Sequence, residues 1–376
     1  MTSNTPAEVF PPGDYIREAL EARGWTQADL GMIMNRPIQV VNQIINAKKA
    51  ITPETAKELA EAFDTSPELW LNLETAFSLK ESGGPAGQVQ RRAAIYKIAP
   101  VGDMQKRHWI KGTKSAEELE QELNRFWGVS LLSAIPQLRA AARANTGPDY
   151  TLTPPQYTWC RQALRLSSGV GVSAHSKGAL VATIPALRAL AVHAEEVRKV
   201  PRVLASIGIR FLVVEHLPRS LIDGAALWRP DGSPVVALSL RFGRIDSFWH
   251  TLCHELAHLL SEDNQNCVDI DLVGPTCAHG KEQQEVERRA NAMAANMLIP
   301  KDRLEGFIAR KRPYFYKEDI RGFAKLVGVH PGIVVGQLQF RGMIPYSANR
   351  EMLEDVREIV TQSALTDGWG HTITDN

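Results

Sequence analysis

Two histidines and a glutamate form the clearest chemical pattern in the chain, His254-Glu255-Leu256-Ala257-His258. In a helix, side chains four residues apart lie on one face, so both imidazoles can bind the same tetrahedral metal ion. Glu255 lies beside them and can take a proton from a metal-bound water, because zinc lowers the pKa of such a water to about 7. The pattern predicts a hydrolytic zinc site in which Glu255 passes the proton to a leaving amine.

A catalytic zinc ion also needs a third protein ligand and one open position. The predicted helix at residues 282–298 offers two acids. Glu287 shares its face with apolar residues and should point inward, whereas Glu285 lies on a more polar side. Glu287 is the predicted ligand, with Glu285 as the runner-up and the loop residue His279 as a weaker candidate. A second metal cluster is the less common explanation for four further residues, Cys267, Asp269, Asp271 and Cys277.

A third histidine, His250, lies one turn before His254 on the same helical face. The three histidines cannot all reach one ion, because each turn advances the helix by about 5.4 Å. His250 is therefore either a packing residue or a group that lines the substrate cleft. The predicted strand at residues 234–240 can offer its backbone edge to an extended peptide, which would suit a peptidase that acts on a mobile segment.

The N-terminal part of the sequence contains a candidate DNA-binding helix at residues 37–46. In a helix-turn-helix, the first residues of the second helix contact base edges, while preceding residues bind phosphates. We expect Asn35 to adopt the left-handed conformation at the turn. The predicted inward side chains are Ile38, Val41, Ile44 and Ile45. The predicted DNA contacts are Arg36, Gln39, Asn42, Gln43, Lys48 and Lys49.

Charge gives this DNA-binding prediction little support. The formal net charge of the chain is +1, and residues 1–80 carry seven Lys and Arg against eleven Asp and Glu. The alternative is a small helical domain that only dimerises or binds protein. Residues 91–114 reverse the balance, with seven basic residues against Asp103 alone. This stretch is either a solvated linker face or an arm that contacts phosphates beside the DNA-binding helix.

The pattern of residues 13–79 predicts five short helices. Three of them follow hydroxyl residues that can act as N-caps, Thr26, Thr52 and Ser66. Residues 81–87 indicate a flexible joint, and residues 88–200 are mostly helical, without chemistry that we can assign.

From residue 208 onward, short β-rich runs precede a series of helices. The predicted strands, separated by turn residues, indicate a small antiparallel sheet and lie at residues 209–214, 225–228 and 235–240. The predicted helices lie at residues 247–260 and 282–298, followed by a pair within residues 318–340 that serves as a packing element or substrate clamp. A helix and a frayed tail complete the chain.

These elements predict an α+β fold that is mostly helical. A chain of 376 residues is longer than one hydrophobic core usually allows. The predicted parts are a helix-turn-helix domain, a helical linker region, a zincin-like domain with a small sheet, and a C-terminal helix with its tail, at residues 1–80, 81–200, 201–345 and 346–376.

The four cysteines are scattered, which favours reduced thiols over a disulfide framework. No apolar run approaches the roughly 20 residues of a membrane span, and the first 25 residues lack the layout of a secretory signal. We therefore expect a cytoplasmic protein with no membrane partner.

Two parts of the sequence resemble known families. Nearly all of residues 11–76, including NRPIQVVNQIINAKKAITPETAKELAEAFD, is similar to the HigA-type antitoxin branch of the Xre/Cro helix-turn-helix family. The segments HTLCHELAHLLSED and EVERRANAMAANMLIP resemble the ImmA/IrrE metallopeptidase family. This second resemblance implies that His254, His258 and Glu287 bind zinc and that Glu255 is the catalytic base. The family often has an apolar aromatic residue where His250 stands.

The two resemblances together imply a transcriptional regulator with a zinc-dependent endopeptidase domain. Relatives of the two halves work as pairs in which the peptidase cleaves a helix-turn-helix repressor. The expected partners are operator DNA and a repressor-type protein, cleaved in cis or in trans, and we expect a homodimer. The alternative is a non-catalytic, HigA-like antitoxin or repressor in which the zinc domain senses or scaffolds, with a toxin as partner.

Overall fold

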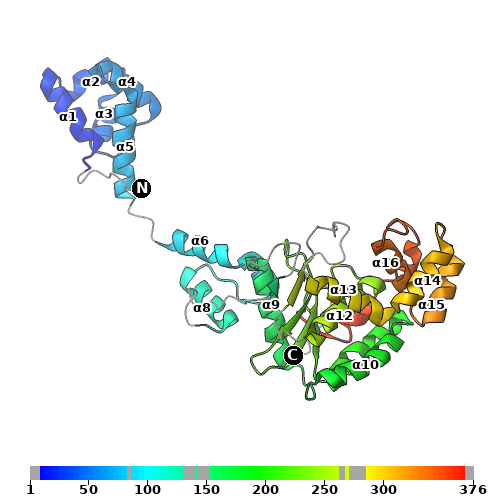
Figure 1. Cartoon of the computed structure of the whole chain (residues 1–376). Coiled ribbons are helices and arrows are strands. Elements are labelled where there is room, and N and C mark those ends of the chain that lie inside the picture. Colours follow the sequence, from blue (N-terminus) through cyan, green and yellow to red (C-terminus); the bar gives the residue numbers. More distant parts are fainter. Residues whose placement is uncertain are drawn as a thin grey trace. The chain divides into compact units, whose positions relative to one another are not determined.

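The computed structural model describes residues 9–82, 87–129, 141–142, 152–261, 267–270 and 285–368. The chain divides into two compact units, Met1–Arg92 and Ala93–Asn376. Among the described residues, helices predominate and the strands form one sheet, which confirms the predicted α+β class (Figure 1). None of the helices in these residues has the length and apolar content that a membrane span requires.

Five helices build the first unit, as predicted: α1 (Pro12–Arg23), α2 (Gln27–Ile33), α3 (Ile38–Ile45), α4 (Pro53–Phe63) and α5 (Pro67–Glu81). The three predicted N-caps are confirmed, since the hydroxyls of Thr26, Thr52 and Ser66 each accept a backbone N–H of the following helix. At α2 the cap is reciprocal, because the Thr26 N–H also donates to Asp29 at 2.7 Å. This backbone hydrogen bond lowers the pKa of the Asp29 carboxyl.

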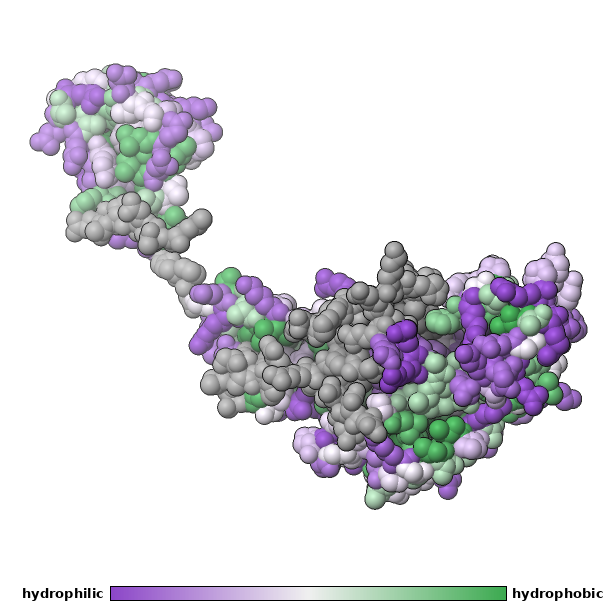
Figure 2. Space-filling view, in the orientation of Figure 1, coloured by the Kyte–Doolittle hydropathy of each residue, from purple (hydrophilic) through white to green (hydrophobic). Residues whose placement is uncertain are grey.

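The core of the first unit forms where its helices α1 to α5 meet. Its largest fully buried side chains include Leu30, Phe63 and Trp70. Gly13 allows α1 to approach α3 closely, because a Cβ at this position would lie 1.8 Å from the Ile45 carbonyl oxygen. Figure 2 shows a mainly hydrophilic surface over these helices. The buried apolar side chains therefore hold α3 in a fixed position against its neighbouring helices.

The boundary between the two units falls within α6 (Gln88–Ile98). The described part of residues 88–200 is mostly helical, as predicted. Its main helices are α7 (Val101–Lys106), α8 (Ala116–Trp127), α9 (Pro154–Leu166) and α10 (Lys177–Leu190), followed by α11 (Val200–Ser206). The end of α6 and the next three helices cover one face of the sheet, whereas α10 and α11 belong to the hydrophobic cluster on the other face.

The sheet is mixed, so the prediction of an antiparallel sheet is wrong. Within the described residues its order is β1-β5-β3-β4-β2-β6. The pair β3 and β4 is antiparallel, whereas β2 runs parallel to both β4 and β6. The reason is that β4, and not β3, lies next to β2: β3 runs opposite to β2 and its partner β4 reverses the direction again, so β4 and β2 run the same way. The strand bounds are β1 (Ala141–Ala142), β2 (Arg210–Val213), β3 (Ile222–Trp228), β4 (Pro234–Leu238), β5 (Cys267–Ile270) and β6 (Leu365–Thr366).

This order also overturns the prediction that residues 234–240 offer a free edge to a peptide. β4 lies between β3 and β2, and both of its edges are paired. Val236, for example, is in register with Ala226 on one side and with Phe211 on the other. A substrate strand therefore cannot add to β4.

Alternation along the strands divides the second unit into three layers. Phe211, Val213 and Val236 belong to the hydrophobic cluster that contains α12 (Ile245–Leu260). Leu212 and Val235, their direct neighbours in sequence, belong to the cluster formed with α8 and α9. Because successive side chains of a strand point to opposite faces, both faces of the sheet are buried. The apolar alternation thus holds α12 against the sheet.

The helix α12 is the centre of this second layer and packs against α13 (Glu285–Leu298), α16 (Pro331–Phe340) and β3 (Figure 1). Phe248, Trp249 and Leu252 are almost completely buried along it. The predicted helical pair is confirmed as α15 (Lys317–Val327) and α16, and sequence reasoning missed α14 (Lys301–Lys311). A helix buried on all sides can hold polar side chains at fixed positions.

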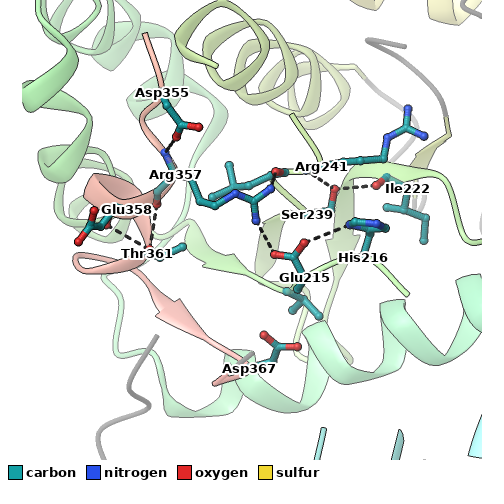
Figure 3. Close-up of polar contacts among 12 residues, drawn as sticks. Glu215, His216, Ile222, Ser239, Arg241, Asp355, Arg357, Glu358, Thr361 and Asp367 are labelled. Atoms are coloured by element: carbon teal, nitrogen blue, oxygen red, sulfur yellow. Dashed lines mark hydrogen bonds and ion pairs between the residues drawn. The ribbon is translucent and has the colours of Figure 1, made fainter. Parts of the chain in front are cut away.

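The segment after residue 346 differs from the expected helix and frayed tail, because it includes both α17 (Arg357–Thr361) and the strand β6. Figure 3 shows Arg357 reaching the loop after β2, where it donates to Glu215 Oε2 at 2.6 Å. Arg107 donates to the carbonyl oxygens of Glu215 and His216 at 2.6 and 2.7 Å. Arg357 thus fastens the C-terminal segment to the loop after β2, and Arg107 joins the end of α7 to the same loop.

Candidate metal centre and nucleic-acid interface

The predicted histidine motif lies on α12 and is deeply buried. His254 and Glu255 have 0% of their surface exposed and His258 has 4%. Polar groups at such depth are unfavourable unless they are hydrogen-bonded or bind a metal. The long apolar face of α12 supplies the burial, and the four-residue spacing places both imidazoles on one side. The sequence therefore builds a polar cluster inside an otherwise apolar layer.

The ring nitrogens of the two histidines converge with the carboxylate of Glu287. His254 Nε2 lies 2.9 Å from His258 Nε2 and 3.1 Å from Glu287 Oε2, and His258 Nε2 lies 3.6 Å from Glu287 Oε1. Tetrahedral ligands at zinc bond lengths of about 2.0–2.1 Å are roughly 3.3 Å apart. Two imidazole nitrogens at this separation repel one another unless a proton or a cation lies between them. The three groups thus fit around one ion.

Glu287 supplies a further sign of an incomplete site. It is 5% exposed on α13, and its Oε1 atom is buried without a hydrogen-bond partner among the described residues. A buried carboxylate oxygen in this condition is costly unless a cation compensates it. Together with His254 and His258 it forms a group whose ligand atoms all lie within 4.8 Å of one another, so the group could hold a metal ion.

Glu285, the runner-up, lies elsewhere on α13. It is exposed, and its carboxylate forms an ion pair with Arg289 one turn later. The helix periodicity explains the contrast, because residues two positions apart project about 200° apart around a helix. His279, Asp271 and Cys277 lie outside the described residues, as do the side chains of Cys267 and Asp269.

Glu255 lies on the side of α12 that faces β3. A Cβ placed on Gly224 of β3 would lie 2.3 Å from Glu255 Oε1. Glycine at this strand position therefore makes room for the carboxylate. Sequence reasoning missed Gly224, although an isolated glycine inside a predicted strand is a recognised sign that another group approaches the backbone.

His250 is half-buried one turn before His254, with ring centroids 6.2 Å apart. Its ring lies 6.1 Å from that of Phe340 at the end of α16. Both residues help to line a cavity of about 320 Å³. Of the two interpretations of His250, the structure therefore favours the lining of a cleft beside the metal cluster.

Cys253, beside His254 in sequence, does not belong to the group of candidate ligands among the described residues, which consists of His254, His258 and Glu287. It is a buried free thiol, as is Cys160, and burial raises the pKa of each to about 12. The prediction of reduced cysteines is confirmed for these two residues.

The candidate DNA-binding helix is α3, preceded by Asn35 in the predicted left-handed conformation with φ 51°. Gln39, Asn42 and Gln43 are exposed, as a base-contacting face requires. Ile38 was predicted to face inward, but it is 50% exposed. The helix begins at this residue, which places Ile38 at its outer end beyond the reach of the core.

The remaining predicted DNA contacts divide into free and engaged side chains. Lys48 and Lys49 are exposed just after α3. Arg36, in contrast, forms a bidentate ion pair with Glu58 of α4, with Nη2 3.0 Å from Oε1. This hydrogen bond raises the pKa of the Arg36 guanidinium. Arg36 therefore joins α3 to α4 and is only partly available to a phosphate.

The basic stretch at residues 91–114 contains both exposed and buried side chains. Six of its seven basic side chains are exposed, in agreement with either interpretation of that stretch: Arg91, Arg92, Lys97, Lys106, Lys111 and Lys114. Arg107 is 8% exposed and binds the two carbonyl oxygens after β2, so it belongs to neither a solvated face nor a DNA-binding arm. Burial lowers the pKa of the Arg107 guanidinium, against the effect of nearby acids.

Comparison with known proteins places these two sites in separate families. Residues 16–70 match the family model described as helix-turn-helix, and residues 213–338 match the peptidase family model described as IrrE N-terminal-like domain. The uncharacterized HTH-type transcriptional regulator YddM of Escherichia coli (strain K12) is 34% identical over 71 residues, which span 19% of this chain and 76% of YddM.

The chain belongs to the helix-turn-helix transcriptional regulators. This regulator also carries an IrrE N-terminal-like, peptidase-family domain, so both predicted resemblances are confirmed. A second regulator of the same type, from Haemophilus influenzae (strain ATCC 51907 / DSM 11121 / KW20 / Rd), is 36% identical over 80 residues, or 21% of this chain and 72% of the relative.

Solved structures similar to the regulator include antitoxin GraA, with 32% identity and a TM-score of 0.19 over 19% of this chain and 80% of that one. Another is the Pseudomonas aeruginosa antitoxin HigA with higBA promoter, with 26% identity and a TM-score of 0.20. That match covers 25% of this chain and 98% of the antitoxin.

Proposed function

We propose that this regulator combines operator binding through its helix-turn-helix with a zinc-dependent endopeptidase that cleaves a repressor-type protein. The observation that carries the enzymatic part is the convergence of His254, His258 and Glu287 on one point inside the second unit. Two imidazoles and one carboxylate with an open fourth position are the usual ligands of a catalytic zinc ion. The mixed nitrogen and oxygen donors favour zinc over magnesium or calcium.

In this proposal the two histidines and Glu287 hold the ion, and Glu255 performs the proton transfers. Bound zinc would lower the pKa of a water molecule to about 7 and polarise the peptide carbonyl. Glu255 would take a proton from this water as its oxygen bonds to the carbonyl carbon, and would give that proton to the amine as the C–N bond breaks. The buried surroundings of Glu255 exclude bulk water, which keeps the proton on this path.

The DNA-binding part of the proposal rests on α3 and the residues after it. Gln39, Asn42 and Gln43 present amides to solvent, and such amides pair with adenine edges in the major groove. Lys48 and Lys49 supply the phosphate contacts. A homodimer would place two copies of α3 on a palindromic operator. Operator binding places the chain in the cytoplasm, and the cleaved repressor can be this chain, its second copy or a separate regulator.

The decisive experiment compares the wild type with Glu255→Gln after loading both with zinc. Each is incubated with its own apo form and with separate helix-turn-helix repressors, and fragments are identified by mass spectrometry. Glu255→Gln preserves side-chain size, so we expect full zinc content and an unchanged melting temperature. We expect cleavage to fall by about 10²- to 10⁴-fold, the usual contribution of general acid–base catalysis.

Two outcomes would redirect the proposal. Equal cleavage by the wild type and Glu255→Gln would exclude Glu255 as the base. Absence of cleavage by the zinc-loaded wild type, together with operator binding that Glu255→Gln leaves unchanged, would favour the non-catalytic repressor, in which the metal domain senses or scaffolds.

A further inference from the structure

The cavity beside His250 lies within the second unit, between α12, α13 and α16. Its volume is about 320 Å³, within the range of small ligand sites. Apolar groups supply most of the lining, from Ala292, Ala295 and Leu298 of α13 and from Ile333 and Phe340 of α16. Tyr346, in the loop after α16, completes that wall.

This cavity adjoins the metal cluster along two helices. His250 lies one turn before the ligand His254, and Asn291 lies one turn after the ligand Glu287. One helical turn advances about 5.4 Å, and successive residues of an extended peptide are about 3.3 Å apart. A peptide whose scissile carbonyl lies at the cluster would therefore bring a bordering side chain to the cavity.

The charged groups of the lining are Arg244, Asp246 and Arg341, which together give a formal charge of +1. Arg244 donates to Asp246 at 2.8 Å, which balances the buried carboxylate of Asp246. The positive charge that this pair leaves over is that of Arg341, which is partly exposed to solvent. Because most of the remaining lining is apolar, an acidic side chain is the occupant against which an apolar one has to be tested.

Two amide oxygens of the lining can bind the backbone of a peptide. Gln339 is 2% exposed, and its Nε2 donates to the carbonyl oxygens of Tyr346 and Ala348 at 3.3 and 3.0 Å. These two bonds fix which end of the amide is the oxygen. Gln339 Oε1 and Asn291 Oδ1 are buried without a hydrogen-bond partner among the described residues. Both can accept an N–H group from an occupant.

We propose that this cavity is the specificity pocket of the peptidase: it receives the side chain that borders the cleaved bond and selects a large apolar residue, foremost an aromatic one. Asn291 and Gln339 accept N–H groups of the bound peptide. The inference rests on the proposed zinc peptidase function and names the substrate class of that site. The pocket thereby selects a peptide segment with a normally buried aromatic residue, which is exposed when a repressor unfolds locally.

The test measures binding and does not require turnover. Hydroxamates, which bind an open zinc position, are made in two series, N-acetyl amino-acid hydroxamates and α-substituted succinyl hydroxamates, which place the side chain on either side of the metal. Each series carries methyl, isobutyl, benzyl and carboxyethyl groups. Calorimetry on the zinc-loaded full chain should show benzyl bound roughly tenfold to hundredfold more tightly than methyl in one series, as burial of an aromatic ring predicts.

Two variants connect that preference to the pocket. Ala295→Leu fills the cavity and should reduce the benzyl preference at least about tenfold, while methyl binding changes little. Phe340→Ala removes one wall and should weaken benzyl alone. Met293→Leu is the matched control, because Met293 lies on the same helix but lines a separate groove. Zinc content and melting temperature show that each variant is folded.

The possible results separate the inference from the function on which it rests. Equal binding of all side chains, or tightest binding of carboxyethyl, would overturn the specificity pocket but keep the accessible zinc ion. A benzyl preference that Ala295→Leu leaves intact would place the aromatic group elsewhere and overturn the pocket as well. If no hydroxamate binds to folded, zinc-loaded protein, the open coordination position is absent, and both the pocket and the peptidase proposal fail.

Discussion

The metal cluster and the α3 surface represent opposite ways to build a functional site. His254, Glu255 and His258 are buried on a helix that is packed on all sides, and they meet Glu287 from a second helix. The amides of α3 are exposed, and the core of the first unit holds only the reverse side of the helix. The side chains of Gln39 and Gln43 face solvent, whereas the Asn42 amide donates to Gln27 and accepts from Asn46 at the surface of the unit.

The two sites therefore differ in how far their side chains are fixed before a ligand binds. Burial holds the side chains of the cluster in one geometry without a ligand. The exposed side chains of α3 take a defined geometry only when they contact DNA. Substitutions at the cluster should accordingly have large effects, and substitutions on α3 should have graded ones.

Apart from changes to the ligands and to Glu255, the largest effect should come from Gly224→Ala. The added Cβ would lie 2.3 Å from Glu255 Oε1, so the carboxylate must move. A misplacement of a catalytic group by about 1 Å can lower the rate by about 10²-fold. Peptide hydrolysis and zinc content are measured together, and we expect only hydrolysis to fall. Gly178→Ala is the control, because its Cβ would meet nothing within 4 Å. Equal rates for both variants would contradict the close approach of Glu255 to β3.

The α3 surface should show intermediate effects. Gln39→Ala and Asn42→Ala should each weaken binding to an operator selected from random DNA by about 1–3 kcal/mol, and each should relax the preference at one base pair. Lys48→Ala should instead weaken binding to all sequences alike and reduce the salt dependence. If Gln39→Ala and Lys48→Ala behaved identically, α3 would contact only the DNA backbone.

A smaller effect should distinguish the structural role of Arg36 from its DNA contact. Arg36→Ala and Glu58→Ala each remove one partner of the ion pair between the α2–α3 turn and α4. Because both side chains are partly exposed, we expect each variant to lower the free energy of unfolding by less than about 1 kcal/mol. A double-mutant cycle in urea measures the coupling. Additive effects would show that the pair contributes nothing to the first unit.

The smallest effect concerns acid stability of the second unit. Burial raises the pKa of Glu215, but the hydrogen bond from His216 and the charge of Arg357 outweigh it, so the pKa lies below its ordinary value of 4.5. The folded state therefore binds fewer protons, and this contribution is present above about pH 4.5 and lost as the pH falls through the folded pKa. Urea unfolding between pH 3 and 6 should show a shallower loss in Glu215→Gln than in the wild type.

The sequence predicted that His254, His258 and Glu287 lie together, because each choice had a local physical reason. The spacing of His254 and His258 fixes their common face, and the apolar neighbours of Glu287 indicate its inward direction. The hydroxyl caps likewise predicted where α2, α4 and α5 begin. These signals all act within one or two helical turns.

Features that depend on distant partners could not be predicted in this way. The parallel pairing of β2 with β4 depends on β4 lying between β3 and β2, so alternation within each strand suggested an antiparallel sheet with a free edge. The burial of Arg107 depends on carbonyl groups more than 100 positions away in sequence, at Glu215 and His216. Ile38 is exposed because the core of the first unit does not extend to the first residue of α3, and the pattern within α3 does not show this limit.

The most direct test of the metal centre is the zinc content of the purified, folded chain and of two matched variants on the same helix, Glu287→Ala and Glu285→Ala. We expect about one zinc ion per chain in the wild type and in Glu285→Ala, and little or none in Glu287→Ala. Circular dichroism of each sample establishes that the fold is intact. A folded wild type without metal, or a Glu287→Ala variant that keeps its zinc, would contradict the proposed centre.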